Sequence, residues 1–159
     1  MTQEDKDLVL KDMCSRVPYG LRLWIKMYER KPDYFIKSHN ILSSVNYTTL
    51  SPRISIEGAL YDIEGPEYSC GEQYIKPYLR PMSSMTENEF QDLKSYSGLI
   101  YDQLELQEFY DNSKCLEFYL SEIPSYVVIL VFDWLNKSMF DYRGLIPRGL
   151  ALEAPKDMY

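Results

Sequence analysis

The chain has 159 residues, 45% hydrophobic and 14% aromatic, which suits one packed domain and excludes a disordered tail. Its formal net charge of −7 argues against nucleic acid as a partner of the whole chain, because the acidic stretches would repel phosphate. The first residues are charged and do not fit a secretory leader. The longest apolar run, Val127 to Phe132, is too short to span a membrane. We therefore expect a cytoplasmic protein with no membrane partner.

The first predicted element is a helix that Thr2 caps. Acidic residues fill its opening turn, and Leu8, Val9 and Met13 give it an apolar stripe. Val17 and Pro18 end it. From Leu21 to Tyr28 apolar and polar residues alternate, which predicts a half-buried strand with Arg22, Trp24, Lys26 and Tyr28 on its polar face.

Further short strands are predicted at 34–38, 41–50, 54–63 and 73–79, separated by turn signals such as Gly65-Pro66. A string of short strands has to bury its faces by curling or by being covered. We therefore expect residues 1–82 to form a small antiparallel sheet or an SH3-like barrel behind the N-terminal helix.

The clearest local signal lies at Thr86. Thr86 and Glu89 form a capping box, and Met85 and Phe90 form a hydrophobic staple, so a helix is predicted from here to about Tyr96. A second helix is predicted from Ser125, because the apolar run continues to Asn136 without turn residues, although its β-branched residues would also suit a buried strand. The fold class that follows is α+β, in one domain over 1–159, with an acidic and mainly helical half at 83–159.

The net charge is unevenly distributed. Residues 1–82 hold 11 basic and 11 acidic residues, whereas residues 83–159 hold 6 and 13. Nine of these acids lie between Thr86 and Glu122. A solvated acidic face, or a contact surface for a protein with a basic surface, is the expected consequence. The candidate binding residues there are Glu105, Glu108, Asp111 and Glu117.

The segment Asp141-Tyr142-Arg143-Gly144 is a second candidate. Arg143 is expected to pin the C-terminal tail through an acid or a carbonyl, and Gly144 indicates a sharp turn. The alternative is a recognition patch, because Tyr and Arg are enriched at the centres of protein interfaces. Tyr142 and Arg143 are therefore candidate binding residues as well.

Catalytic signatures are absent from the sequence. His39 is the only histidine, and there is no GxGxxG, P-loop, HExxH or EF-hand motif, so we predict no catalytic residues, no cofactor and no metal site. The three cysteines are widely spaced without a CxxC pair. Two alternatives stay open: an enzyme that uses carboxylates and a divalent metal, and a reader of peptides or nucleic acid built on the β-rich half.

Two strings carry a resemblance. They are KPYLRPMSSMT at 76–86, and FDYRGLI at 140–146 continuing through GLALEAP at 149–155. With the N-terminal helix, they resemble an uncharacterised family of small proteins from gut anaerobes and their phages or mobile elements. The resemblance implies an accessory protein that binds a host or phage component, and it implies no activity. The leading hypothesis is thus a non-enzymatic accessory protein that binds a protein partner through an acidic surface, with its oligomeric state left open.

Overall fold

The computed structural model describes residues 1–25, 39–47, 52–56, 59–62, 75–98 and 124–159. The chain divides into two compact units. Unit 1 comprises Met1–Leu79 and Arg143–Met158, and unit 2 comprises Arg80–Tyr142 together with Tyr159. The prediction of one domain over 1–159 stays a prediction. The C-terminal tail groups with the β-rich part of the chain and not with the helices that precede it.

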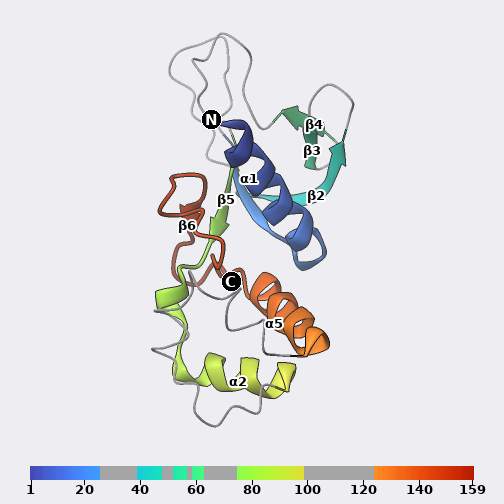
Figure 1. The fold of residues 1–159 in the computed structure, drawn as a ribbon. Coiled ribbons are helices and arrows are strands. Elements are labelled where there is room, and N and C mark those ends of the chain that lie inside the picture. The colour runs from blue at the N-terminus through green and yellow to red at the C-terminus, as the bar shows by residue number, and fades with distance from the viewer. Residues whose placement is uncertain (26–38, 48–51, 57–58, 63–74, 99–123) are drawn as a thin grey trace. The chain divides into compact units, whose positions relative to one another are not determined.

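Unit 1 begins with helix α1, Gln3–Arg16 (Figure 1). Thr2 caps it as predicted, because its hydroxyl accepts from the Asp5 backbone N–H at 3.1 Å while the Asp5 carboxylate accepts from Thr2. The apolar stripe is present in Val9, Leu10 and Met13, which are buried. A short 3-10 helix, Val17–Tyr19, follows where Pro18 was expected to end α1.

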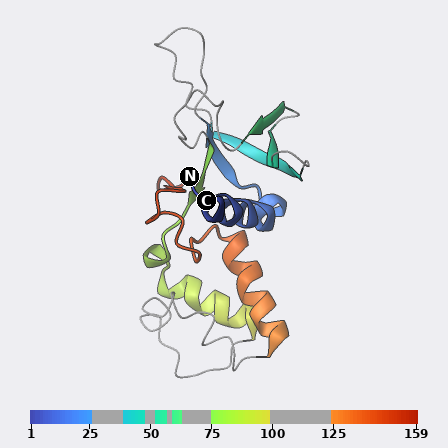
Figure 2. The ribbon, with the colours of Figure 1, turned by 45° about the horizontal axis from the view of Figure 1, so that its top comes forward.

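The strands of unit 1 form one sheet. Among the described residues the order is β4-β3-β2-β1-β5-β6, with β1 Arg22–Ile25, β2 His39–Tyr47, β3 Pro52–Ile56, β4 Ala59–Asp62, β5 Ile75–Leu79 and β6 Leu152–Glu153. The four pairings from β4 to β5 are antiparallel, and β5 pairs with β6 in parallel, so the sheet is mixed. Figure 2 shows β2, β1 and β5 side by side. The α+β class is confirmed.

One strand prediction is wrong. The run 54–63 was expected to be a single strand, but Ile56 faces Ala59 in an antiparallel pair, so β3 and β4 are two strands of a hairpin. Only Glu57 and Gly58 separate them in the sequence, and a glycine between two such runs is a signal for a tight turn. The predicted strand at 34–38 lies outside the described residues.

The alternation in β1 determines what each face of the sheet presents. Leu21 and Leu23 are fully buried, as are Ile75 and Leu79 of β5, whereas Arg22 and Trp24 are half-buried. The expected two-residue period is therefore confirmed as far as Trp24. Lys26 and Tyr28 lie outside the described residues.

The tail after Arg143 is ordered against unit 1. β6 pairs with β5, and the Ala154 backbone N–H donates to the Leu79 carbonyl at 2.8 Å. Lys76 Nζ donates to the Gly149 carbonyl at 2.6 Å, and Leu145 and Leu150 are buried. The apolar residues that alternate with glycine and proline in this tail explain why it packs instead of fraying.

The structure describes two helices in unit 2. Helix α2, Glu87–Ser97, begins at the predicted capping box, since Thr86 and Glu89 satisfy one another's N–H groups. It ends at Gly98, whose φ of 70° lies in the left-handed region. A 3-10 turn, Met82–Ser84, precedes it.

The segment that could have been a helix or a buried strand is a helix, α5, Ser125–Lys137. It contacts α2. Val127, Val131 and Leu135 are buried, whereas Val128 is half-buried. Among the described residues, no helix is long and apolar enough to cross a bilayer. Among the residues that the structure describes, the core of unit 2 includes Met82, Met85, Phe90, Leu93, Val127, Val131, Leu135 and Phe140.

Candidate functional site

The predicted binding residues fall into two groups in the structure. Glu105, Glu108, Asp111 and Glu117 lie outside the described residues. Tyr142 and Arg143 are described, but they belong to different units. Tyr142 ends the continuous stretch of unit 2, and Arg143 begins the C-terminal tail, which belongs to unit 1. Adjacency in sequence therefore does not make them one patch, and each is considered with its own unit.

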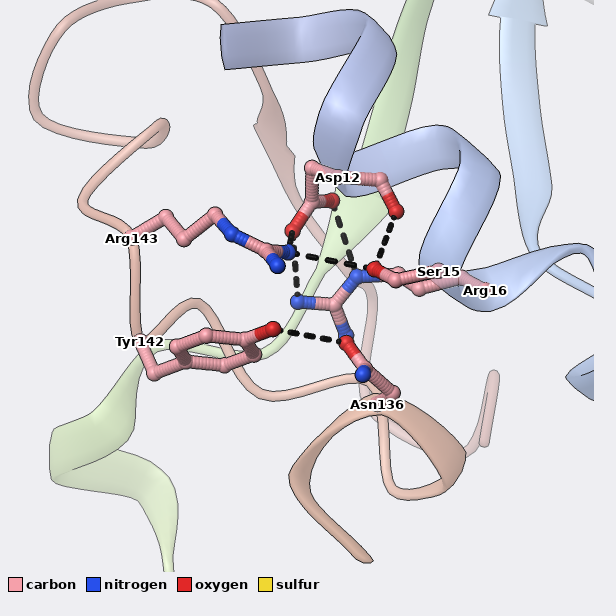
Figure 3. Close-up of polar contacts among 6 residues, drawn as sticks. All are labelled: Asp12, Ser15, Arg16, Asn136, Tyr142 and Arg143. Carbon is pink, nitrogen blue, oxygen red and sulfur yellow. Dashed lines mark hydrogen bonds and ion pairs between the residues drawn. The ribbon is translucent and has the colours of Figure 1, made fainter. Parts of the chain in front are cut away.

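Arg143 contacts helix α1 within unit 1 (Figure 3). Its Nη1 donates to Asp12 Oδ1 at 2.7 Å and to Ser15 Oγ at 3.1 Å. Its side chain is 17% exposed, and Asp12 is fully buried. The expected pin between the tail and an acid is thus present, and Gly144 follows it with a φ of 70°.

Asp12 holds a second arginine that the sequence analysis did not single out. Arg16 Nε donates to Asp12 Oδ2 at 2.8 Å and Arg16 Nη2 donates to Oδ1 at 2.9 Å, and both side chains are fully buried. A fork of this kind fixes the orientation of both groups. The sequence signal for this pair is its spacing, because residues four apart on a helix lie on the same face. Asp12 and Arg16 share the buried side of α1 with Val9 and Met13.

Tyr142 is held inside unit 2. Its hydroxyl donates to Asn136 Oδ1 at 3.0 Å (Figure 3). Its ring centroid lies 5.1 Å from that of Phe132, and the two ring planes are inclined at 41°. These contacts fix the end of the unit against α5. A role for Tyr142 in recognition stays a prediction.

The start of α2 carries an ion pair. Arg80 Nη1 lies 2.7 Å from Glu89 Oε1, and the Arg80 guanidinium lies 4.2 Å from the centroid of the Phe140 ring. Partial burial of Glu89 acts to raise its pKa, but the hydrogen bonds from Arg80 and Thr86 outweigh it, and the pKa is lowered. Glu89 is therefore a structural carboxylate with both oxygens in use.

Apolar residues are exposed on the outer side of α5. Tyr126 and Ile129 are each 67% exposed, and Tyr96 of α2 is 44% exposed. The Tyr96 hydroxyl donates to Asp133 Oδ2 at 2.7 Å, which links the two helices. This hydrogen bond to a carboxylate is the main reason that the pKa of Tyr96 is raised.

The charge of the chain divides along the boundary between the units. Unit 2 holds 11 Asp and Glu against 4 Lys and Arg, which accounts for the whole net charge of −7. Unit 1 holds 13 of each sign and is neutral. Glu87 and Asp92 on α2 are exposed members of the acidic set. Charge is thus a property of one unit and not of the surface as a whole.

Metal-binding side chains do not cluster in the described part of the chain, where no three His, Cys, Asp or Glu side chains lie closely enough to hold a metal ion. Cys14 is a free thiol whose pKa is raised by partial burial. Comparison of the chain with protein-family models, with curated proteins and with solved structures found no match.

Proposed function

We propose that this chain is a non-enzymatic interaction protein whose unit 2 binds the basic surface of a protein partner. The observation that carries the proposal is the confinement of the net charge of −7 to Arg80–Tyr142 while the rest of the chain is neutral. The resemblance of its two strings to small proteins of phages and mobile elements supports an accessory role in such an element. A cytoplasmic location follows from that role.

The charge supports recognition more directly than catalysis. An excess of seven negative charges on one compact unit attracts a basic surface over the distance that salt leaves unscreened, about 8 Å at physiological ionic strength. Such a field raises the rate of association and discriminates against acidic partners. Binding that depends on it weakens as salt is added, which gives the proposal a measurable signature.

The first experiment is a pull-down with the tagged full chain from lysate of its source cells, at low and at moderate salt. The test variant reverses three acids of unit 2, Glu105→Lys, Glu108→Lys and Glu117→Lys. The matched control reverses three acids of unit 1, Glu64→Lys, Glu67→Lys and Glu72→Lys, and so changes the net charge by the same amount. Equal melting temperatures of the two variants establish that both are folded.

We expect the parent chain to capture one stoichiometric partner at low salt and to lose it at moderate salt. At low salt, the unit 2 variant should fail to capture this partner, and the unit 1 variant should still capture it. Equal loss from both variants would mean that net charge alone attracts the partner, and the proposed role of unit 2 would then be wrong. An empty pull-down together with a melting temperature that rises with Mg²⁺ or Mn²⁺ would favour the enzyme that uses carboxylates and a metal.

A second candidate function is a reader of peptides or nucleic acid on the β-rich part, and the strand register favours it. Arg22 faces Ile41, and Trp24 faces Lys76, so these residues share the face opposite to the buried leucines. Aromatic and cationic residues alternating on a sheet face suit a strand of anionic ligand. A ligand bound on an open sheet face does not need the predicted SH3-like barrel. Only an enclosed ligand would require the sheet to close into that barrel. A gel shift that stays negative at low salt would refute it for nucleic acid.

A further inference from the structure

The outer face of α5 departs from the ordinary pattern of a surface helix. Tyr126 and Ile129 are each 67% exposed, although other apolar residues of the same helix, Val127, Val131 and Leu135, are buried in the core. A spacing of three residues places them on one face, and Asp133 continues that face one turn further along. Single exposed apolar residues are common, whereas a contiguous apolar patch marks a contact surface.

Helix α2 extends this face. Tyr96 lies beside it, since its hydroxyl donates to Asp133 at 2.7 Å, and 44% of Tyr96 is exposed. Asp92 is exposed one turn before Tyr96 on α2, at a spacing of four residues. Two tyrosines and an isoleucine are therefore bordered by Asp92 and Asp133. We call this set of five residues the Tyr126 face.

The composition of the Tyr126 face identifies the chemistry of its occupant. Tyrosine is enriched at the centres of interfaces, where its ring is buried and its hydroxyl stays hydrogen-bonded, as that of Tyr96 already is. Carboxylates at the border, on a unit with a net charge of −7, complement Lys or Arg. An amphipathic helix binds such a surface by placing apolar residues at i, i+3 and i+4 on the apolar centre.

We propose that the Tyr126 face docks a basic amphipathic helix of the protein partner. This inference rests on the proposed function and adds the place and form of contact. The apolar side of the partner helix covers Tyr126 and Ile129. Its Lys or Arg residues pair with Asp92 and Asp133. Binding then has an apolar part that survives added salt and an electrostatic part that does not.

The test measures binding of two labelled synthetic peptides to the full chain by fluorescence anisotropy. One peptide, (LKKLLKK)2, presents its leucines on one side of a helix, and the other, (LKLKLKK)2, has the same composition with a two-residue period. The test variant is Tyr126→Ser with Ile129→Ser. The matched control is Ile41→Ser, which removes an exposed apolar side chain, 54% exposed, from β2.

We expect the helical peptide to bind more tightly than the other. The double variant should weaken its binding about 30-fold, the size of a loss at an interface hot spot. The control should bind as the parent chain does. Near-UV circular dichroism of each variant verifies that its core is intact.

Three outcomes overturn the inference, and the first of them separates it from the proposed function. If the double variant binds the helical peptide unchanged while the three reversed acids of unit 2 abolish capture of the lysate partner, the proposed function stands and the Tyr126 face is not the site. If both peptides bind equally, charge alone acts and the apolar contact is wrong. If neither peptide binds at low salt, the inference is refuted whatever the pull-down gives.

Discussion

Arg80 and Glu89 form an ion pair of 2.7 Å in which Glu89 also completes the capping box of α2. One carboxylate thereby accepts from the Arg80 guanidinium and from the Thr86 backbone N–H, at 2.8 Å in the second case. The Arg80 guanidinium in turn covers the Phe140 ring. The beginning of α2 is thus tied to the end of unit 2 through a single side chain.

Replacing Glu89 with Gln is expected to lower the free energy of unfolding by about 1 kcal/mol at neutral pH, because it removes a charged cap and a partly screened ion pair. Since the folded-state pKa of Glu89 is lowered, its contribution is present above the ordinary carboxylate range and is lost as the pH falls below about 4. Urea unfolding at pH 7 and pH 3 measures this. Glu87→Gln is the control, because the exposed Glu87 carboxylate accepts a hydrogen bond from the Gln91 side-chain amide. Equal losses of unfolding free energy in the two variants would contradict the expectation.

The buried carboxylate of Asp12 gives the largest expected effect. Asp12→Ala leaves the fully buried Arg16 guanidinium without its fork, and breaking a buried ion pair costs about 3 to 5 kcal/mol. Asp7→Ala, on the exposed side of the same helix, should cost less than about 1 kcal/mol. Denaturant titrations followed by tyrosine and tryptophan fluorescence compare the two. A loss under 1 kcal/mol for Asp12→Ala would show that the pair is dispensable.

The two arginines of the tail are expected to differ. Arg143 pairs with a fully buried acid, so Arg143→Ala should destabilise unit 1 by about 2 kcal/mol. Arg148 pairs with Asp5 at 2.7 Å and with the exposed Glu4 at 3.6 Å, and its substitution should matter much less. Unfolding in 0.5 M NaCl distinguishes them further, because salt screens the contribution of Arg148 and not that of Arg143. Equal salt dependence would be evidence against this assignment.

Gly98 is required for its backbone conformation and not for space. A Cβ at this position meets no atom within 4 Å, yet its φ of 70° is costly for an L-residue. Gly98→Ala should therefore cost about 1 kcal/mol in thermal or urea unfolding. Ser95→Ala in the exposed helix interior is the control and should be neutral or slightly stabilising. Stabilisation by Gly98→Ala would mean that the C-cap conformation is not required.

The hydrogen bond between Tyr96 and Asp133 should be visible in alkaline titration. Because the folded-state pKa of Tyr96 is raised, the stability it contributes is fully present below about pH 10 and is lost as the pH rises through the raised value. Subtracting the tyrosinate absorbance of Tyr96→Phe from that of the parent isolates this titration. Asp133→Asn removes the charge and should lower the midpoint. An unchanged midpoint would exclude the carboxylate as the cause.

Local signals predicted the helix boundaries well. The starts of α1 and α2 follow from capping residues that lie within three positions of one another, and α2 ends at Ser97, one residue beyond the expected Tyr96. The helical state of α5 follows from its length, despite its β-branched start. Which of Val127 and Val128 is buried depends on where α2 packs, and that is not a local property.

Long-range contacts escaped prediction for the same reason. The pin formed by Arg143 was expected, but its partner was not, because Asp12 lies 131 residues away in sequence. The burial of Asp12 with Arg16 was not expected either, because an Asp and an Arg four residues apart on a helix usually form an exposed pair. The hairpin of β3 and β4 was missed because the single predicted strand included Glu57 and Gly58, the two residues between the strands. The parallel position of β6 requires knowledge of the completed sheet, since a strand of two residues has no pattern of its own.

The order of the two units along the chain has a consequence for biosynthesis. β5 ends at Leu79, but its parallel neighbour β6 begins only at Leu152, after the whole of Arg80–Tyr142 has been synthesised. A ribosome therefore releases every residue of that continuous segment before the sheet can receive its last strand. Backbone hydrogen bonds join the two ends of that segment, since the Arg80 N–H donates to the Met139 carbonyl at 2.8 Å and the Asp141 N–H donates to the Arg80 carbonyl at 2.7 Å. The sheet that begins in the part translated first therefore receives its last strand only after the intervening segment has been synthesised.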